Sequence, residues 1–221
     1  MRDNYREQLD GILGDLVAMN HKVADAVRVS TKALLEADLH RAEQVISSDE
    51  QIDEIRNGLE ARAFQLLARQ SPVAGELRML VASLRMVTEL ERMGDLAAHV
   101  AKIARMRYPE CAVPDPMRGN FTRMAEVAEK MVISAGKVLA NRDVAAAQDV
   151  QERDEEMDDL RKSQFRSLLS DEWTHGVEAA VDVALLGRYY ERIADHADSM
   201  ARRVVYIVTG EFPDDEAWPE P

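Results

Sequence analysis

The chain has 221 residues, of which 46% are apolar and 31% charged, and a formal net charge of −13 at pH 7. This acidity argues against binding to the phosphate backbone of a nucleic acid, because such binding needs a basic face. We therefore expect no nucleic acid among its partners. The single cysteine excludes a disulfide framework and a cysteine-based zinc site.

The predicted elements are all helices. Ala, Leu, Glu, Arg and Met are plentiful, and apolar residues recur at spacings of three and four, which predicts an all-α chain. Asp38 and Asp143 are predicted N-caps, as is Ser71, which would place Pro72 at a first helical position. The predicted helices, in chain order, cover residues 4–37, 39–70, 73–107, 117–141, 144–170 and 177–209.

The second half of the chain repeats the first. The sequence VISSDEQIDEIR at 45–56 matches VQERDEEMDDLR at 150–161, and ERMGD at 91–95 matches ERIAD at 191–195. Residues 108–116 hold three prolines and form the predicted linker. We therefore expect two tandem three-helix bundles of six long antiparallel helices in an elongated molecule. The expected domains are residues 1–109, residues 110–211 and an acidic disordered tail at 212–221.

Each repeat carries two pairs of acids at a spacing of four, which places both acids of a pair on one helix face. In each repeat the two pairs lie roughly twenty residues before and after a turn, so an antiparallel hairpin brings all four to one level, about 30 Å from the turn. We call these sets the first and the second acid cluster. The first acid cluster is Asp49, Asp53, Glu91 and Asp95, and the second is Asp154, Asp158, Glu191 and Asp195.

Four carboxylates at one level repel one another. Two charges 6 Å apart cost about 3 kcal/mol at an effective dielectric constant near 20, so protonation, salt bridges or a cation must relieve them. Hard cations such as Mg, Mn, Ca or iron suit oxygen ligands, and Zn or Ni could bind with histidine or water. Spacing alone leaves a metal site, a salt-bridge network and a solvated acidic face open. The candidate salt-bridge partners are Arg56, Arg92 and Lys102 in the first repeat and Arg161, Arg192 and Arg202 in the second.

Enzyme motifs are absent from the sequence. A di-iron oxidase bundle needs two Glu-x-x-His segments on different helices, and the only match is Glu172 to His175, in a predicted turn. His99 lies one turn beyond Asp95 and could extend the first acid cluster. We therefore expect no enzymatic activity.

With six helices in two copies and acid-x-x-x-Asp motifs on the second and third helix of each, the chain resembles the PhoU family. The residues that carry the resemblance are Glu91-Arg92-Met93-Gly94-Asp95, Glu191-Arg192-Ile193-Ala194-Asp195, Asp49-x-x-x-Asp53 and Asp154-x-x-x-Asp158. The sequence departs from the commonest family pattern at His99 and Ser199, where Asn is frequent. The resemblance covers residues 4–210.

The resemblance implies a function. PhoU proteins restrain a phosphate ABC transporter and help to hold a membrane sensor histidine kinase in its inhibiting state when phosphate is plentiful. Several members bind iron or zinc clusters through these acids, which implies a metal ion (Fe, Zn, Mn, Mg or Ni) at each acid cluster. We therefore expect a cytoplasmic negative regulator that does not insert directly into a membrane. We also expect a homodimer, because the helices have amphipathic faces. The alternative is a metal-dependent helical enzyme or a metal-storage protein that uses the same acids.

Overall fold

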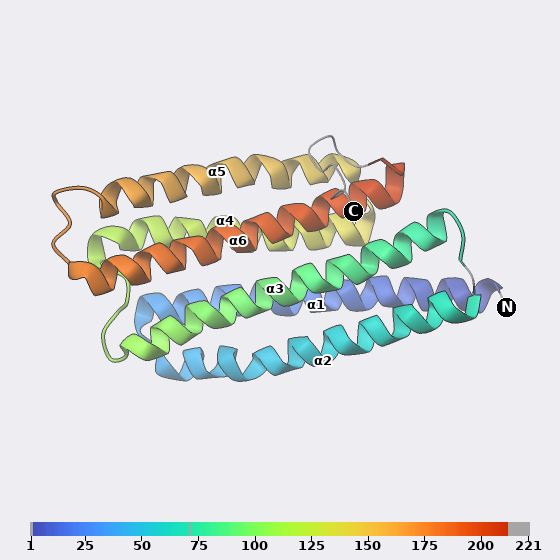
Figure 1. Cartoon of the computed structure of the whole chain (residues 1–221), viewed down its shortest axis with the longest axis horizontal. Helices are drawn as coiled ribbons and strands as arrows, with labels where there is room; N and C mark the ends of the chain where they lie inside the picture. Colours follow the sequence, from blue (N-terminus) through green and yellow to red (C-terminus); the bar gives the residue numbers. More distant parts are fainter. Residues whose placement is uncertain (1, 71, 212–221) are drawn as a thin grey trace, which may run out of the picture.

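The computed structural model of the protein describes residues 2–70 and 72–211. Within these residues the chain forms six helices and no strand, which confirms the predicted all-α class. The helices lie along one long axis (Figure 1). Their bounds are α1 Arg2–Glu36, α2 Leu39–Gln70, α3 Gly75–Arg107, α4 Asp115–Asn141, α5 Val144–Leu168 and α6 Gly176–Thr209.

Two of the predicted caps are confirmed. The backbone N–H of Arg41 donates to the Asp38 carboxylate at 3.0 Å, and the N–H of Ala145 donates to Asp143 at 3.0 Å. The third cap, Ser71, lies outside the described residues. The predicted start of the third helix at residue 73 is wrong by two residues, because Ala74 has a φ of 49° and precedes the first helical residue. The acidic tail expected at 212–221 also lies outside the described residues.

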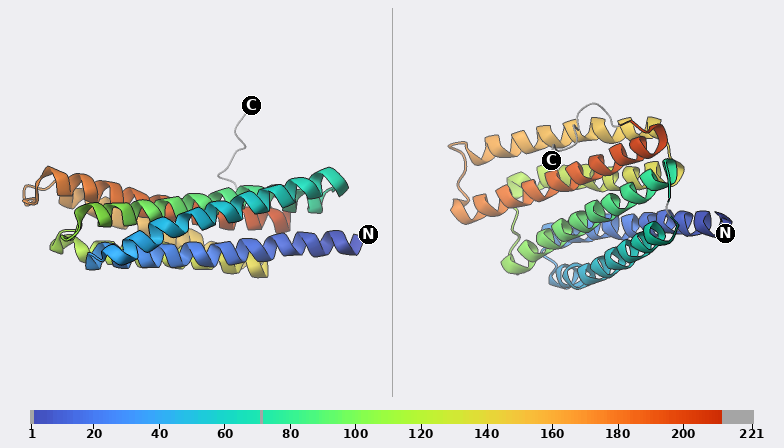
Figure 2. Two further views of the ribbon diagram at one scale, coloured as in Figure 1. Left: turned by 90° about the horizontal axis from the view of Figure 1, so that it is seen from below. Right: turned by 45° about the vertical axis from the view of Figure 1, so that its right-hand side comes forward.

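The two three-helix units lie side by side. Helix α3 packs against α6 and α1 against α4, whereas α2 and α5 lie at the outer edges of the molecule (Figures 1 and 2). The buried apolar side chains form one continuous cluster that crosses from one unit to the other. One buried stripe of α3 is part of it, and its members are Met86, Leu90, Met93, Ala97, Val100 and Ala104.

Buried polar side chains also join the two units. Asn20 of α1 donates to the carbonyl oxygen of Val132 in α4 at 3.0 Å, and it lies directly over Gly136. A Cβ atom at Gly136 would be 2.2 Å from Asn20 Nδ2, so only glycine leaves room for this bond. The hydroxyl groups of Thr31 and Tyr190 lie 2.8 Å apart. These contacts fix the register of the two bundles, because a buried polar group without a partner is costly.

Ion pairs between α3 and α6 complete the junction. The carboxylate of Glu89 lies 2.7 Å from His196 Nδ1 and 2.9 Å from Arg203, and all three side chains are at most 18% exposed. Burial alone would raise the pKa of Glu89, but hydrogen bonds from His196 and Arg203 outweigh it and lower the pKa. Near the other end, Arg107 Nε lies 2.5 Å from the buried carboxylate of Asp182.

Candidate functional site

The first acid cluster lies along the contact between α2 and α3. The α2–α3 hairpin brings the acids together, because Arg56 lies 4.0 Å from Asp53 of α2 and 3.3 Å from Glu91 of α3. Glu91 is buried, with its side chain 11% exposed, whereas those of Asp95 and Asp53 are 40% and 52% exposed. The cluster therefore has one sheltered carboxylate and an open outer side.

Gly94 allows the two helices to approach closely at this level. A Cβ atom there would lie 2.9 Å from Ile52 Cδ1 and 3.7 Å from Asp49 Oδ1. The small residue in the Glu-Arg-Met-Gly-Asp motif thus has a packing role, because a larger side chain would push α2 and its carboxylates away from α3.

Glu91 is the most constrained member of the first acid cluster. Arg56 lies 3.3 Å from Oε1 and Arg92 Nε lies 3.6 Å from Oε2, which confirms both as partners. Oε2 is buried and accepts no hydrogen bond. Burial raises the pKa of Glu91, and Asp95 and Asp53 add to this effect, against the lowering effect of Arg92 and Arg56. The arginines therefore relieve the repulsion only in part.

The outer side of the first acid cluster carries Asp49, His99 and Lys102. Burial, followed by the charge of Asp95, raises the pKa of Asp49, whereas Lys102 and His99 act to lower it. The imidazole Nδ1 of His99 lies 2.7 Å from the backbone carbonyl oxygen of Asp95, and its ring contacts that of Tyr189 edge to face at 5.5 Å. His99 thus lies within electrostatic reach of the cluster, with Nδ1 already engaged.

The second acid cluster occupies the equivalent position between α5 and α6. Arg161 Nε lies 3.2 Å from the carboxylate of Glu191, and the equivalent distance in the first repeat, from Arg56 to Glu91, is 3.3 Å. Arg188 also pairs with Glu191, at 2.9 Å. Arg161 was expected from the sequence, whereas Arg188 replaces the expected Arg192, which is exposed. The repeat is therefore preserved in the ion pairing as well as in the acids.

Asp154 experiences the strongest repulsion. Burial, and then the charges of Asp198, Asp195 and Asp158, raise its pKa to about 6. Burial and then Glu191 also raise the pKa of Asp195. Asp198 does not belong to the predicted set.

Asp198 is a fifth acid on the same side of α6. It lies three residues after Asp195 and seven after Glu191, which is the spacing that places it on their helix face. Arg202, expected as a partner of the second acid cluster, lies 2.6 Å from Asp198. The corresponding residue of the first repeat is Ala98, so the repeat does not indicate that Asp198 adjoins the second acid cluster. Its helical spacing from Glu191 and Asp195 does indicate this.

The donor chemistry of both clusters fits a cation. The raised pKa values of Glu91 and Asp154, and the Oε2 of Glu91 that accepts no hydrogen bond, indicate negative charge that the arginines leave incompletely neutralised. Within residues 2–70 and 72–211, however, no three acidic, histidine or cysteine side chains converge closely enough to enclose a metal ion. A metal would therefore have to draw the carboxylates inward, and metal binding stays a prediction.

The hydropathy of the helices bears on membrane association. No helix in the described part of the chain combines the length and the apolar character needed to cross a bilayer.

Comparisons with known proteins identify relatives of the whole chain. The model of the PhoU domain matches residues 16–104 and 121–204, one match in each repeat. The phosphate-specific transport system accessory protein PhoU homolog 2 of Mycobacterium tuberculosis is 48% identical over 213 residues, covering 96% of this chain and all of that protein. PhoU homolog 1 of Mycobacterium leprae is 46% identical and covers 99% of both chains.

Solved structures share the fold. The crystal structure of PhoU from Pseudomonas aeruginosa superimposes with a TM-score of 0.88 at 28% identity, covering 94% of this chain and 100% of that one. The phosphate transport system regulatory protein PhoU from Streptococcus pneumoniae gives a TM-score of 0.85 at 22% identity. The second likeness shows the fold alone.

Proposed function

Because this chain belongs to the PhoU family, we propose that it is a regulator of phosphate transport that acts by protein–protein contact rather than by catalysis. In this proposal it is a cytoplasmic negative regulator of phosphate uptake and of the phosphate-starvation response. Its partners are the ATPase of a phosphate ABC transporter and a membrane sensor histidine kinase. The names of relatives that are 44–48% identical support the link to phosphate transport.

The observation that carries the proposal is the placing of both acid clusters at equivalent helix contacts. Each cluster has an inner glutamate bonded to an arginine, Glu91 with Arg56 and Glu191 with Arg161, and exposed aspartates outside it. Two equivalent charged sites on one long molecule suit a protein that binds partners through electrostatic complementarity.

We also propose that each acid cluster binds one metal ion, which would neutralise the carboxylates and link neighbouring helices. Asp49, Asp53, Glu91 and Asp95 would hold the first ion. Asp154, Asp158, Glu191 and Asp195 would hold the second. Fe, Zn, Mn, Mg and Ni all accept carboxylate oxygen ligands, with Mg and Mn suiting an all-oxygen set best.

Elemental analysis tests the metal proposal. We would compare protein purified without chelators with the variant Asp49→Asn/Asp53→Asn, which removes two charges at nearly constant volume. The matched control is Glu50→Gln/Glu54→Gln, because these acids have the same spacing on the same helix and are exposed. Metal retained by wild type and control but reduced in the cluster variant supports the site. Equal metal content in all three proteins contradicts it.

Self-association is part of the proposal. Val177, Val181 and Leu185 recur every four residues along α6 and are 43–81% exposed, and Leu169 nearby is 83% exposed. Apolar stripes of this kind mark contact surfaces. Light scattering should give the molar mass of a homodimer for wild type and that of a monomer for Val181→Glu. A monomeric wild type would contradict the proposal.

Co-purification tests the regulatory function. Tagged protein from phosphate-replete cells should retain the transporter ATPase and the sensor kinase, and Asp49→Asn/Asp53→Asn should retain less of them than Glu50→Gln/Glu54→Gln. Failure of the folded wild-type protein to retain either partner would contradict the proposed mechanism.

A further inference from the structure

A small groove lies where the start of α3 meets the end of α6. These two helix ends are neighbours (Figure 1 and the right view of Figure 2), and residues of both line the groove. The groove has a volume of about 220 Å³. An apolar cavity of roughly 150 Å³ accepts a benzene ring, so this space is large enough for an aromatic side chain. Its main lining residues are Leu77, Arg78, Val81, Arg85, Arg203 and Tyr206.

The groove is basic although the protein is strongly acidic. Three arginines and no acidic residue line it, whereas the whole chain has a net charge of −13. Arg78 is half-buried and has no ion pair with any described residue, and its Nε is buried without a hydrogen-bond partner. The Nε of Arg203 is also buried without one, although the same guanidinium bonds Glu89. Buried Nε–H groups that lack an acceptor, as in Arg78 and Arg203, favour an anionic partner.

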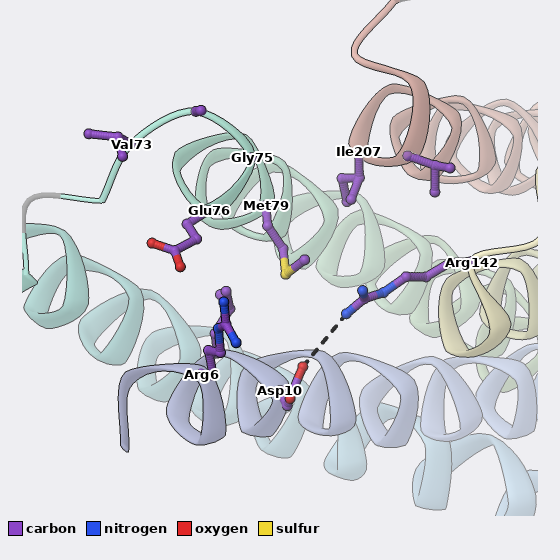
Figure 3. A pocket seen from close by; sticks show the side chains of 11 residues that line it. Arg6, Asp10, Val73, Gly75, Glu76, Met79, Arg142 and Ile207 are labelled. Carbon is purple, nitrogen blue, oxygen red and sulfur yellow. Dashed lines mark ion pairs between the residues drawn. The ribbon is translucent and has the colours of Figure 1, made fainter. Parts of the chain in front are cut away.

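A larger cavity on the other side of the same helix ends lacks this charge imbalance. It has a volume of about 760 Å³ and is drawn in Figure 3. Arg6 and Arg142 line it together with Asp10 and Glu76, and Arg142 lies 3.6 Å from Asp10. Its two cations and two anions balance, so an acidic segment gains more from the smaller groove.

We propose that the segment after α6, residues 212–221, docks into the groove between α3 and α6 of its own chain. Its sequence, FPDDEAWPEP, contains four acids, no lysine or arginine, and two aromatic residues, Phe212 and Trp218. The acids complement the arginines, and an aromatic ring matches the apolar wall formed by Leu77 and Val81. While docked, the segment would cover the groove against any other acidic chain.

The connection to α6 favours docking within one chain. Helix α6 ends at Thr209, and the next residue, Gly210, has a φ of 83° and turns the chain out of the helix. A Cβ atom at Gly210 would lie 2.5 Å from Arg78 Nη1, so the segment leaves beside the unpaired guanidinium. From Gly210 to Trp218 an extended chain reaches about 26 Å, and the groove from Arg78 to Arg85 spans about 10 Å of helix. The segment is therefore long enough to cover it.

Fluorescence quenching of the full chain tests the proposal. The chain has two tryptophans, so Trp173→Phe leaves Trp218 as the only one. At low salt, acrylamide should quench the fluorescence of Trp218 less in the Trp173→Phe protein than in the same protein that also carries Arg78→Glu. Arg78→Glu should lower the docked-to-free ratio about tenfold, as expected for one charge-assisted hydrogen bond. About 0.5 M salt should also expose Trp218, since it screens the charges.

Two further variants make the result decisive. Asp214→Asn/Asp215→Asn/Glu216→Gln neutralises the segment without touching the helices, and it should expose Trp218 as Arg78→Glu does. Arg166→Glu, an exposed reversal on α5, is the matched control and should leave quenching unchanged. Equal quenching in the wild-type segment, the neutralised segment and Arg78→Glu would overturn the proposal. Protection that disappears on dilution would also overturn it, because the segment would then bind a second copy.

Discussion

Glu89 offers a direct test of how the two bundles are held together. Its carboxylate bonds both His196 and Arg203 across the α3–α6 contact. Glu89→Ala would remove the acid that these two residues share and leave the Arg203 guanidinium, whose side chain is 12% exposed, without a counter-charge among residues 2–70 and 72–211. Arg203 Nε already lacks a hydrogen-bond partner, so the variant would leave a further N–H group of this guanidinium without an acceptor.

The magnitude follows from the burial of the group. Breaking a fully buried pair costs about 3–5 kcal/mol, and the partial exposure here reduces the expected loss in the free energy of unfolding to about 2–3 kcal/mol. For a chain of this length the Tm should fall by about 5–10 °C. Glu89→Gln keeps a hydrogen-bond acceptor and should lose less.

The pH dependence has a definite sign. The pKa of Glu89 is lowered in the folded protein, so the folded state binds this proton less tightly than the unfolded state does. The stabilisation by Glu89 is therefore complete above its unfolded pKa of about 4.3 and is lost as the pH falls through the lower folded pKa. The difference between wild type and Glu89→Gln should shrink accordingly in acid.

Urea unfolding followed by circular dichroism measures these differences. The control is Glu126→Ala, which removes a 50%-exposed carboxylate that lies 3.0 Å from Arg123 and should change the free energy of unfolding by at most about 1 kcal/mol. If Glu89→Ala unfolds within about 0.5 kcal/mol of wild type, the reasoning about a buried junction is refuted, because even neutral hydrogen bonds contribute more.

Three further predictions use the same measurement. Gly187→Ala should destabilise the protein by about 1–3 kcal/mol, because its Cβ would overlap the buried side chain of Gln164. Gly58→Ala, which has open space around it, should instead stabilise α2 by about 0.5–1 kcal/mol. Equal changes in the free energy of unfolding would contradict the close contact between Gly187 and Gln164. Asp143→Ala should cost about 1 kcal/mol through loss of the α5 cap, and no loss would show that the cap is dispensable. Asp154 has a pKa raised to about 6, so its ionisation destabilises the fold as the pH rises through 6. Asp154→Asn should therefore stabilise metal-free protein by about 1 kcal/mol at pH 8 and hardly at all at pH 4. A larger stabilisation at pH 4 than at pH 8 would contradict the raised pKa.

The sequence predicts the helices well because their signals are local. Apolar spacing, the caps Asp38 and Asp143 and the repeat give six helices with ends within a few residues of those observed. The equal distance of the acid pairs from each turn also predicts which carboxylates meet, since a hairpin of straight helices preserves register.

Contacts between the bundles cannot be predicted from such local signals. Glu89 and His196 are polar residues on separate repeats, and nothing in the spacing of either helix indicates that they bond each other. The same holds for Asn20 over Gly136, which depends on how α1 crosses α4. Asp198 shares a helix face with the second acid cluster and lies four residues before its partner Arg202, so its spacing is a local signal, but its burial depends on how the helices pack.

Expression of a phosphate-starvation reporter in phosphate-replete cells tests the central claim most directly. Cells that lack the native gene would carry wild type, Asp49→Asn/Asp53→Asn or the control Glu50→Gln/Glu54→Gln, each shown to be folded and equally abundant. We predict that wild type and control repress the reporter and that the cluster variant leaves it active. Full repression by the cluster variant would contradict a role for the first acid cluster in signalling, and an active reporter with wild type would contradict the proposed negative regulation itself.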